Sequence, residues 1–349
     1  MDAPDIPGLG GGRIVNLKFL KLSESERKLY IDQAAIQRNV SPIVFEKDFW
    51  VCWLLAVLFR SEFAEHLVFK GGTSLSKVFR AIERFSEDID LSLSPQFLRL
   101  DNAVASRNQA NKWMAKAEEA CGLAVSQQIM PALEHSVQAV LGKKETGWFE
   151  YLTDASTHSP VLLFHYPSSQ PEGFSYLKRS VKLEFGSLTD QQPAGRHAVM
   201  PWIAEVLSQA FPDWQCDVTA LEIERSFWEK ATILHAEYHR PAEKPTPDRF
   251  SRHYADTAAL ARHPLASQAV GRDDLRERVV AWKSQFFGSG WASYDTAKPN
   301  TFKLVPHDTR IPDLKRDYQN MRDMYLEEPA SFDEIITTLR ELEQKINSK

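Results

Sequence analysis

The chain has 349 residues, of which 43% are hydrophobic and 26% are charged, so it is long enough to bury a full core as one large domain or two ordinary ones. This composition excludes a disordered protein. Its 42 basic residues are outnumbered by 47 acidic ones, which gives a net charge of -5. A strongly basic coat for nucleic acid is therefore excluded, and any contact with nucleic acid must come from a local patch.

Sequence features that would direct the chain to a membrane or an oxidising compartment are not found. No apolar run approaches the roughly 20 residues that span a bilayer, and residues 1–15 lack the apolar segment of a signal peptide. The three cysteines, Cys52, Cys121 and Cys216, are far apart and form no C-x-x-C pair, so neither a disulfide framework nor a zinc site is indicated. We expect a cytoplasmic protein with no membrane partner.

The N-terminal part predicts a short tail followed by helices. The Gly/Pro-rich stretch at 7–15 follows no strand and precedes no periodic helix, so we assign residues 1–22 to a flexible tail rather than to a phosphate loop. A helix is expected over 23–39, where a Ser cap precedes an acidic first turn. A second helix should begin with Ser41 as its cap and Pro42 at its first position. Together these form an N-terminal helical layer.

The rest of the chain predicts an α+β fold in two parts. Residues 23–220 are expected to form a domain with a small mixed sheet, interrupted by a helical excursion at about 97–145. Strand-like runs return at 159–167 and 176–187. Residues 221–349 read as a helical C-terminal domain, whose last helix opens with a capping box made by Ser331 and Glu334.

The stretch HLVFKGGTSLSK indicates a strand, a tight turn and a helix. HLVF is a short apolar run, and Leu75, Val78, Phe79 and Ile82 follow at helical spacing. The glycines of the turn, Gly71 and Gly72, let a ligand approach the main chain, while the new helix directs free N–H groups to the same place. Thr73 and Ser74 add hydroxyl donors, so the turn is suited to a phosphate. A plain tight turn with a capped helix is the alternative.

The next motif, SEDIDLSL, predicts a half-buried strand that carries two carboxylates on one face. Ile89 and the two leucines after it alternate with Asp88 and Asp90, which is the period of two that a strand shows. Residues two apart on a strand are about 6.5 to 7 Å apart, so their side chains can converge on one or two Mg²⁺ ions, for which carboxylate oxygens are suitable ligands. A solvated strand face is the alternative for a D-x-D pair that stands alone.

A third carboxylate is offered by SVKLEFGS. Its apolar residues face one way, while Lys182 and Glu184 face the other. Glu184 could complete a metal triad with the two aspartates, and Lys182 could balance phosphate charge. An edge strand with a charged outer face explains this segment equally well.

A lysine lies on the apolar face of the helix predicted at LEIERSFWEKATILHAEYH. Lys230 shares helical spacing with Phe227 and Leu234, so it points inward and needs an anion. That anion is either a salt-bridge partner or a nucleotide triphosphate. In RFSRHYADTAALARH, Arg252 and Asp256 lie four residues apart on one helical face, where a structural ion pair is the simple interpretation.

Five segments in order, GGTSLSK, SEDIDLSL, VKLEF, ERSFWEKATILH and RFSRHYADTAAL, resemble the successive motifs of the AbiEii/AbiGii toxin family. The members of that family are nucleotidyltransferases of bacterial type IV toxin–antitoxin and abortive-infection systems. The resemblance runs from about Phe45 to the C-terminus and is specific in the order of the motifs as well as in their letters.

The resemblance implies roles for particular residues. The family's first motif holds the nucleotide phosphates, the D-x-D pair binds magnesium, and the late motif supplies a Lys and an Asp needed for activity. Carried over position by position, these are Gly71, Gly72, Thr73 and Ser74, then Asp88 and Asp90, then Lys230 and Asp256. The third motif, with Lys182 and Glu184, is assigned more loosely.

Together these observations predict a nucleotidyltransferase with a polymerase-β-like core, N-terminal helices and a helical C-terminal half. It would move NMP from an NTP to an acceptor hydroxyl with Mg²⁺, or Mn²⁺ as the second choice, and Asp256 would orient or deprotonate a reacting group. By resemblance the acceptor is tRNA or another RNA, and a separately encoded antitoxin neutralises the toxin. The alternatives are the same fold acting on a small molecule or a protein, and a catalytically silent nucleotide-binding or interaction protein.

Overall fold

The computed structural model describes residues 17–100, 107–171, 178–212, 214 and 216–348. The Gly/Pro-rich stretch at 7–15 lies outside them. Residues 17–21, which the sequence analysis placed in the flexible tail, form the short helix α1 (Leu17–Lys21). None of the described helices is long and apolar enough to cross a bilayer.

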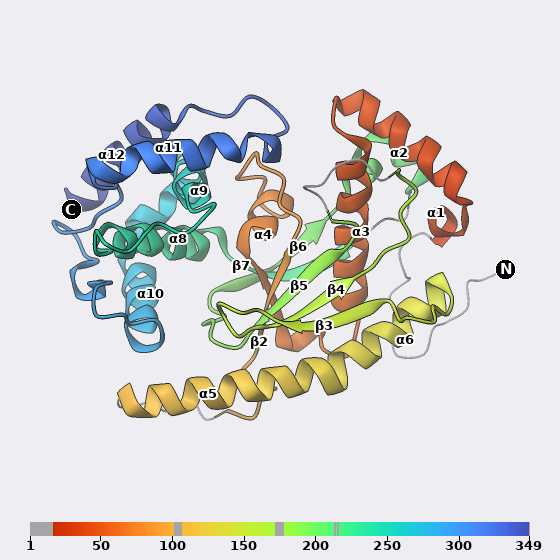
Figure 1. The fold of residues 1–349 in the computed structure, drawn as a ribbon, viewed down its shortest axis with the longest axis horizontal. Helices are drawn as coiled ribbons and strands as arrows, with labels where there is room; N and C mark the ends of the chain where they lie inside the picture. The colour runs from red at the N-terminus through yellow and green to blue at the C-terminus, as the bar shows by residue number, and fades with distance from the viewer. Residues whose placement is uncertain (1–16, 101–106, 172–177, 213, 215, 349) are drawn as a thin grey trace. The chain divides into compact units, whose positions relative to one another are not determined.

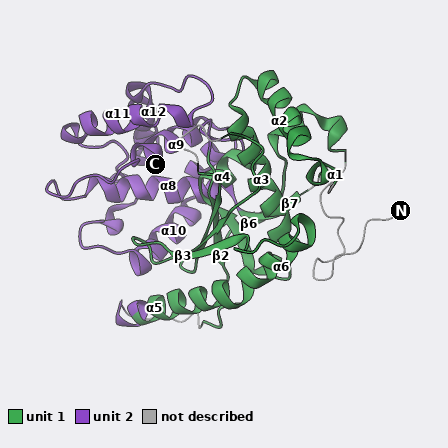
Figure 2. Ribbon diagram, turned by 45° about the vertical axis from the view of Figure 1, so that its right-hand side comes forward, with its two compact units in different colours: residues 1–78, 86–103, 112–220 green, residues 79–85, 104–111, 221–349 purple. Residues whose placement is uncertain are grey.

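The chain divides into two compact units (Figure 2). The first comprises residues 1–78, 86–103 and 112–220, and the second comprises 79–85, 104–111 and 221–349. The second unit therefore includes a seven-residue segment that lies, in sequence, between the two motifs GGTSLSK and SEDIDLSL.

The first unit contains a seven-stranded mixed sheet, as an α+β fold requires (Figure 1). In spatial order its strands are β3 (Phe149–Thr153), β4 (Pro160–Phe164), β5 (Val181–Gly186), β2 (Ile89–Leu93), β1 (Leu67–Lys70), β7 (Cys216–Leu221) and β6 (Ala194–Val199). β2 pairs antiparallel with β1 and parallel with β5, so it lies in the middle of the sheet. A strand in this position is paired along both of its edges, and the burial of its apolar residues fixes its register.

The N-terminal helices of this unit begin where the sequence predicts. α2 (Glu24–Arg38) opens with a capping box between Ser23 and Glu26, which satisfies two N–H groups that the helix leaves free. α3 (Pro42–Leu58) has Pro42 in its first turn. It packs on the sheet through Trp50 and Trp53, whose rings lie 5.9 and 5.8 Å from that of Phe164 on β4.

The segment at about 97–145, expected to be a helical excursion, contains one long run of helix at 107–141 (Figure 1). α5 (Arg107–Ala124) continues through a π-helical turn, η2 (Val125–Ile129), into α6 (Met130–Leu141). The remaining short elements of the first unit are η1 (Ala64–His66), α7 (Trp202–Val206) and η3 (Ser208–Ala210).

The second unit is helical, as expected from residue 221 onward. Its helices are α8 (Ile223–Tyr238), α9 (Ser251–Arg262), α10 (Asp273–Phe286), α11 (Ile311–Asn320) and α12 (Phe332–Asn347), with 3-10 turns η4 (Ala266–Gly271), η5 (Tyr294–Thr296), η6 (Asp308–Arg310) and η7 (Arg322–Met324). α9 packs against both α8 and α12. The predicted capping box of Ser331 and Glu334 begins α12.

One predicted helix is shorter than its apolar pattern suggests. α4 (Gly71–Lys77) ends before Phe79 and Ile82, which the sequence analysis placed on the same helix. Arg80 takes a left-handed φ of 52°, which an uninterrupted helix does not tolerate. Ile82 is buried instead within the second unit, to which the segment 79–85 belongs. The helical spacing of these apolar residues therefore does not mean that they share one helix, because Ile82 is buried in the segment that follows α4.

Three consecutive charged residues of α3, at 46–48, are buried and have partners elsewhere in the first unit. Asp48 is 2% exposed and forms an ion pair of 2.7 Å with Lys77, the last residue of α4. Its other oxygen accepts the backbone N–H of Trp202 at 2.7 Å. Glu46 accepts the backbone N–H of Ser169. These contacts join α3 to α4, to α7 and to the segment that follows β4.

The Asp48→Ala variant tests how much the buried pair stabilises the fold. Its loss leaves the Lys77 ammonium buried without its carboxylate, which should cost about 3–5 kcal/mol of unfolding free energy. Arg316→Ala is the matched control, because its pair with Asp313 is 72% and 74% exposed and should matter by less than about 0.5 kcal/mol. Urea denaturation of both variants gives the comparison. An Asp48→Ala midpoint equal to that of wild type contradicts the account.

Candidate active site

The D-x-D pair lies at the start of β2 and directs both carboxylates away from the core. Ile89 and Leu91 are completely buried, whereas Asp88, directly before the strand, and Asp90 are half-buried. The predicted alternation is therefore observed. Because side chains two residues apart on a strand share a face, the two carboxylates lie on the same side of the sheet.

The glycine turn touches the second of these carboxylates. Gly71 has a φ of +78°, and a Cβ built on it would lie 1.9 Å from Oδ2 of Asp90. Both observations require glycine at this position, since a left-handed φ is strained for any other residue and no side chain fits the space. The backbone of the GGTS turn and the D-x-D pair thus form one continuous surface.

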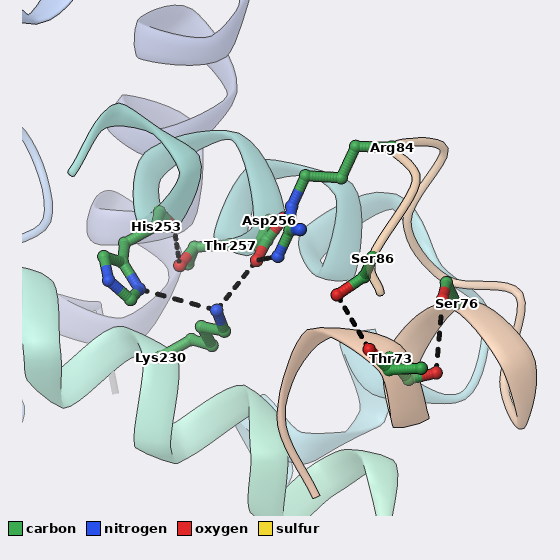
Figure 3. A network of polar contacts seen from close by, with 8 residues as sticks. All are labelled: Thr73, Ser76, Arg84, Ser86, Lys230, His253, Asp256 and Thr257. Carbon is green, nitrogen blue, oxygen red and sulfur yellow. Dashed lines mark hydrogen bonds and ion pairs between the residues drawn. The ribbon is translucent and has the colours of Figure 1, made fainter. Parts of the chain in front are cut away.

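The hydroxyls of the turn have protein partners. Thr73 and Ser74 are completely buried. The Thr73 hydroxyl contacts the carbonyl of Asp88 and lies 2.9 Å from the Ser86 hydroxyl (Figure 3), while the Ser74 hydroxyl donates to the carbonyl of Gly71 at 3.1 Å. These side chains hold the turn against the start of β2. Because both hydroxyls are engaged, the part of the turn that can contact a ligand is the backbone of its glycines.

Glu184 lies beside the pair on the neighbouring strand. It is the register partner of Asp90 in the parallel pairing of β2 with β5. Because β5 lies between β4 and β2, the interpretation of this segment as an edge strand is wrong. Lys182, two residues earlier on the same face, forms an ion pair with Glu184 at 2.8 Å and lies 3.7 Å from Asp154.

The electrostatics of the pair favour an added cation. Burial raises the pKa of Asp88, and the charges of Glu87 and Glu184 add to the rise, while Lys182 and Lys47 oppose it. Burial also raises the pKa of Asp90, with Lys70 opposing the shift and Glu184 and Asp88 adding to it. Crowded carboxylates repel each other unless a positive charge lies between them.

The residues that are present fit a divalent cation in part. Asp88 and Asp90 offer hard oxygen ligands in a partly desolvated place, which suits Mg²⁺. One oxygen of Glu184 is already paired with Lys182. Accordingly, among the described residues no three His, Cys, Asp or Glu side chains are arranged to hold a metal ion. The aspartate pair is the part of the predicted triad that fits.

Lys47 of α3 supports the D-x-D pair from the side. Its side chain is 3% exposed, contacts the carboxylate of Glu87, and donates to the carbonyl of Lys178 at 2.9 Å. Glu87 directly precedes Asp88. Neither Lys47 nor Lys70 was singled out from the sequence, although Lys70 is the register partner of Asp90. Two features of the sequence could have indicated them. Lys70 directly precedes the glycine turn, and Lys47 is a lysine within an otherwise apolar helix.

The second unit brings Lys230 and Asp256 together (Figure 3). Nζ of Lys230 on α8 lies 2.7 Å from Oδ2 of Asp256 on α9. The guanidinium of Arg84 binds the same carboxylate in two places, with Nε 2.8 Å from Oδ1 and Nη2 2.9 Å from Oδ2. Asp256 therefore pairs with Lys230 and Arg84, whereas the simple interpretation paired it with Arg252.

Two cations hold Asp256 ionised. The carboxylate is 1% exposed, and although burial by itself raises its pKa, the charges and hydrogen bonds of Arg84 and Lys230 lower the pKa far below its usual range. Burial lowers the pKa of Lys230, and the nearby Arg84 lowers it further, against the attraction of Asp256. His253, whose pKa burial also lowers, lies with Nδ1 3.4 Å from the Lys230 ammonium.

Comparison with known proteins identifies a family over most of the chain. The family model described as "Nucleotidyl transferase AbiEii toxin, Type IV TA system" matches residues 53–338. Comparison with curated proteins gives no match. Among solved structures the chain is similar to "MenT4, nucleotidyltransferase toxin Rv2826c from Mycobacterium tuberculosis H37Rv", with 15% identity, a TM-score of 0.43, and coverage of 94% of this chain and 99% of that chain.

The Gly71→Ala variant tests the contact between the turn and Asp90. The new methyl group would overlap the carboxylate, so we expect Asp90 to move and transfer activity to fall by roughly 100-fold, the effect of misplacing a group by about 1 Å. Gly142→Ala is the matched control, because Gly142 has a φ of +86° with nothing within 4 Å of its Cβ position. It introduces the backbone strain without the overlap.

The stability of both glycine variants is measured by thermal denaturation, and their activity by a nucleotide-transfer assay. The control should lose about 1 kcal/mol of stability and keep its activity. Equal activity of the two variants would show that the contact with Asp90 does not matter.

Proposed function

The chain belongs to the AbiEii nucleotidyltransferase toxin family of type IV toxin–antitoxin systems, and from this premise we propose that it transfers NMP from an NTP to an RNA hydroxyl, releasing pyrophosphate. The observation that carries the proposal is the contact of the glycine turn with the D-x-D pair. A phosphate-binding backbone beside two carboxylates is the combination that nucleotidyl transfer needs, since the reacting phosphates and their countercharge must meet.

In this proposal Asp88 and Asp90 hold Mg²⁺, or Mn²⁺ as the second choice. Their hard oxygens and raised pKa values support the assignment. When bound, the metal would neutralise charge on the phosphates and make the acceptor hydroxyl more acidic. Glu184 is the third candidate ligand, and it would have to exchange its ion pair with Lys182, which then becomes free to contact phosphate.

The nucleotide phosphates are proposed to bind at the GGTS turn and at Lys230. Gly71 and Gly72 leave the main chain open to a phosphate, while Thr73 and Ser74 keep the turn in place through their buried hydroxyls. Lys230 is a cation whose side chain is only 12% exposed and carries three N–H donors. A triphosphate is the anion that its remaining donor would meet.

Asp256 is proposed to orient Lys230. Both of its oxygens accept hydrogen bonds from cations, and its pKa lies far below the usual range. A carboxylate in that state is a poor proton acceptor, so of the two roles considered from the sequence, orienting is the one that the contacts support.

The acceptor and the regulator follow from the family. A toxin of a type IV system implies an antitoxin, which we propose to be separately encoded, and the resemblance favours tRNA among RNA acceptors. Both substrates, NTP and tRNA, occur in the cytoplasm, where we propose that the protein acts. The net charge of -5 means that RNA has to bind through a local basic surface.

Replacing both aspartates, Asp88→Asn with Asp90→Asn, should abolish transfer without unfolding the protein. Amide oxygens lack the charge that holds Mg²⁺ against a triphosphate. Because both pKa values are raised, the folded state already disfavours the ionised carboxylates, so neutral asparagines should leave thermal stability in EDTA unchanged or slightly raised. A radiolabelled transfer assay and a melting curve in EDTA measure the two effects.

Two results would contradict the double-asparagine prediction. Labelling of RNA at the wild-type rate would show that the pair does not serve the reaction. A melting temperature well below that of wild type in EDTA would show that the pair is a structural feature.

The Lys230→Gln variant tests the triphosphate contact. We expect KM for NTP to rise roughly 10- to 100-fold, the effect of losing a charged hydrogen bond. The fold should persist, because Arg84 still neutralises Asp256. Lys315→Gln serves as the control, since Lys315 pairs only at the surface. An unchanged KM in Lys230→Gln would remove this residue from the nucleotide site.

A further inference from the structure

The carboxylate of Asp256 is shared by two cations, Arg84 and Lys230, which bind it in different ways. Arg84 binds both carboxylate oxygens with its planar fork, at 2.8 and 2.9 Å, while Lys230 contacts one of them at 2.7 Å. Figure 3 shows both side chains directed at the carboxylate. A bidentate guanidinium contact fixes the orientation of a carboxylate, which a single ammonium cannot do. The orientation of Asp256 is therefore set by Arg84.

Arg84 reaches this position because its segment is built into the helical unit. The backbone N–H of Phe85 donates to the carbonyl of Met324 at 2.7 Å, and Arg84 forms an isolated β-bridge with Tyr325. The side chain of Arg84 is 5% exposed. The backbone of Arg84 is thus fixed by its pairing with Tyr325, and its guanidinium is fixed by the carboxylate of Asp256. A residue that positions another side chain has to be held in this way.

The charges of this cluster leave a surplus on Lys230. Two cations face one carboxylate, so the sum over Arg84, Lys230 and Asp256 is one positive charge. Lys230 has two acceptors among the described residues, Asp256 and Nδ1 of His253, against three donors. Without Arg84, the pair of Lys230 and Asp256 would have no net charge.

We propose that Arg84 is a positioning residue for nucleotide binding, whose guanidinium occupies Asp256 so that Lys230 keeps an oriented ammonium and a net positive charge for the triphosphate. This inference rests on the proposed function and deepens it. Arg84 acts through Lys230 and does not itself contact the nucleotide. Its place in the sequence, four residues before Asp88, puts it on the short connection that leads to the carboxylate pair.

A cavity beside the cluster makes the proposal testable by chemical rescue. The cavity has a volume of about 280 Å³ and lies within the second unit. Arg84 and Asp256 line it together with Arg262 and Tyr325. In an Arg84→Ala variant, the space vacated by the side chain adjoins this cavity, so a free guanidinium ion can reach the carboxylate of Asp256.

The first experiment measures steady-state transfer by Arg84→Ala with and without guanidinium chloride at millimolar concentration, well below the denaturing range. We expect KM for NTP to rise roughly tenfold or more, with a smaller change in kcat, because the lost contribution is a charge for binding. Guanidinium should restore KM, whereas the same concentration of NaCl should not. A KM equal to that of wild type in Arg84→Ala overturns the proposal.

Combining the variants tests whether Arg84 works through Lys230. If it does, Arg84→Ala should add little to Lys230→Gln, so the double variant should have nearly the KM of Lys230→Gln alone. Fully multiplicative effects on KM would show that Arg84 acts independently of Lys230 and would overturn the proposal. Arg262→Ala is the matched control, because Arg262 lines the same cavity but contacts Thr338, and its KM should stay within about twofold of wild type.

The Arg84→Lys variant keeps the test decisive if Arg84→Ala does not fold. An ammonium preserves the charge on Asp256 but cannot bind both oxygens. We expect a melting temperature near that of wild type together with a several-fold higher KM for NTP. A wild-type KM in this variant means that the fork is unnecessary, and the proposal is then wrong.

The failure of this inference can be told apart from failure of the proposed function. If the double-asparagine variant at Asp88 and Asp90 still transfers nucleotide, the proposed function is wrong. If that variant is inactive while Arg84→Ala and Arg84→Lys behave as wild type, the proposed function stands and only the role of Arg84 is wrong.

Discussion

The candidate site depends on the contact between a glycine backbone and a carboxylate. Gly71 allows the turn after β1 to lie against Asp90 with no side chain between them. The turn is then held by Thr73, whose hydroxyl contacts the backbone of Asp88. These two contacts join the proposed phosphate-binding turn to the proposed metal-binding carboxylates within about twenty residues of sequence.

The remaining architecture of the first unit supplies rigidity to this contact. β2 lies inside the sheet, with β1 and β5 on its two sides, so the backbone of Asp90 cannot shift without breaking strand pairs. Below it, α3 buries charged residues that pair with Lys77 at the end of α4 and with Glu87 at the start of the D-x-D motif. Such buried ion pairs contribute little net stability but are costly to disrupt. Their effect is therefore to hold α4 and the segment before Asp88 in place.

Local periodicity made much of the fold predictable. The alternation in SEDIDLSL and VKLEF gave the central strands and the side on which Asp90 and Glu184 lie, because burial on a strand has a period of two. A Ser cap with an acidic first turn located the start of α2, and a capping box located the start of α12. The family match over 53–338 agrees with the resemblance drawn from the ordered motifs.

Contacts between residues distant in sequence were not predictable from local pattern. Arg84 and Asp256 are 172 positions apart, and the apolar residues near Arg84 have helical spacing although they lie outside the helix. The inward position of Lys230 was foreseen from its neighbours, but its partner was not. β3, β6 and β7 were not predicted. The sequence of β6 alternates weakly, and pairing in the sheet makes it a strand, whereas the alternation in CDVTAL of β7 was an available signal.

The central claim is that the protein transfers a nucleotide to RNA and releases pyrophosphate. The most direct test is to incubate the protein and Mg²⁺ with total RNA and each NTP in turn, labelled in parallel samples at the α- or the γ-phosphate. The account predicts that label from the α-phosphate of at least one NTP appears on RNA, with one pyrophosphate released for each nucleotide added. Transfer of the γ-label, or pyrophosphate release with no α-label on RNA, would contradict it.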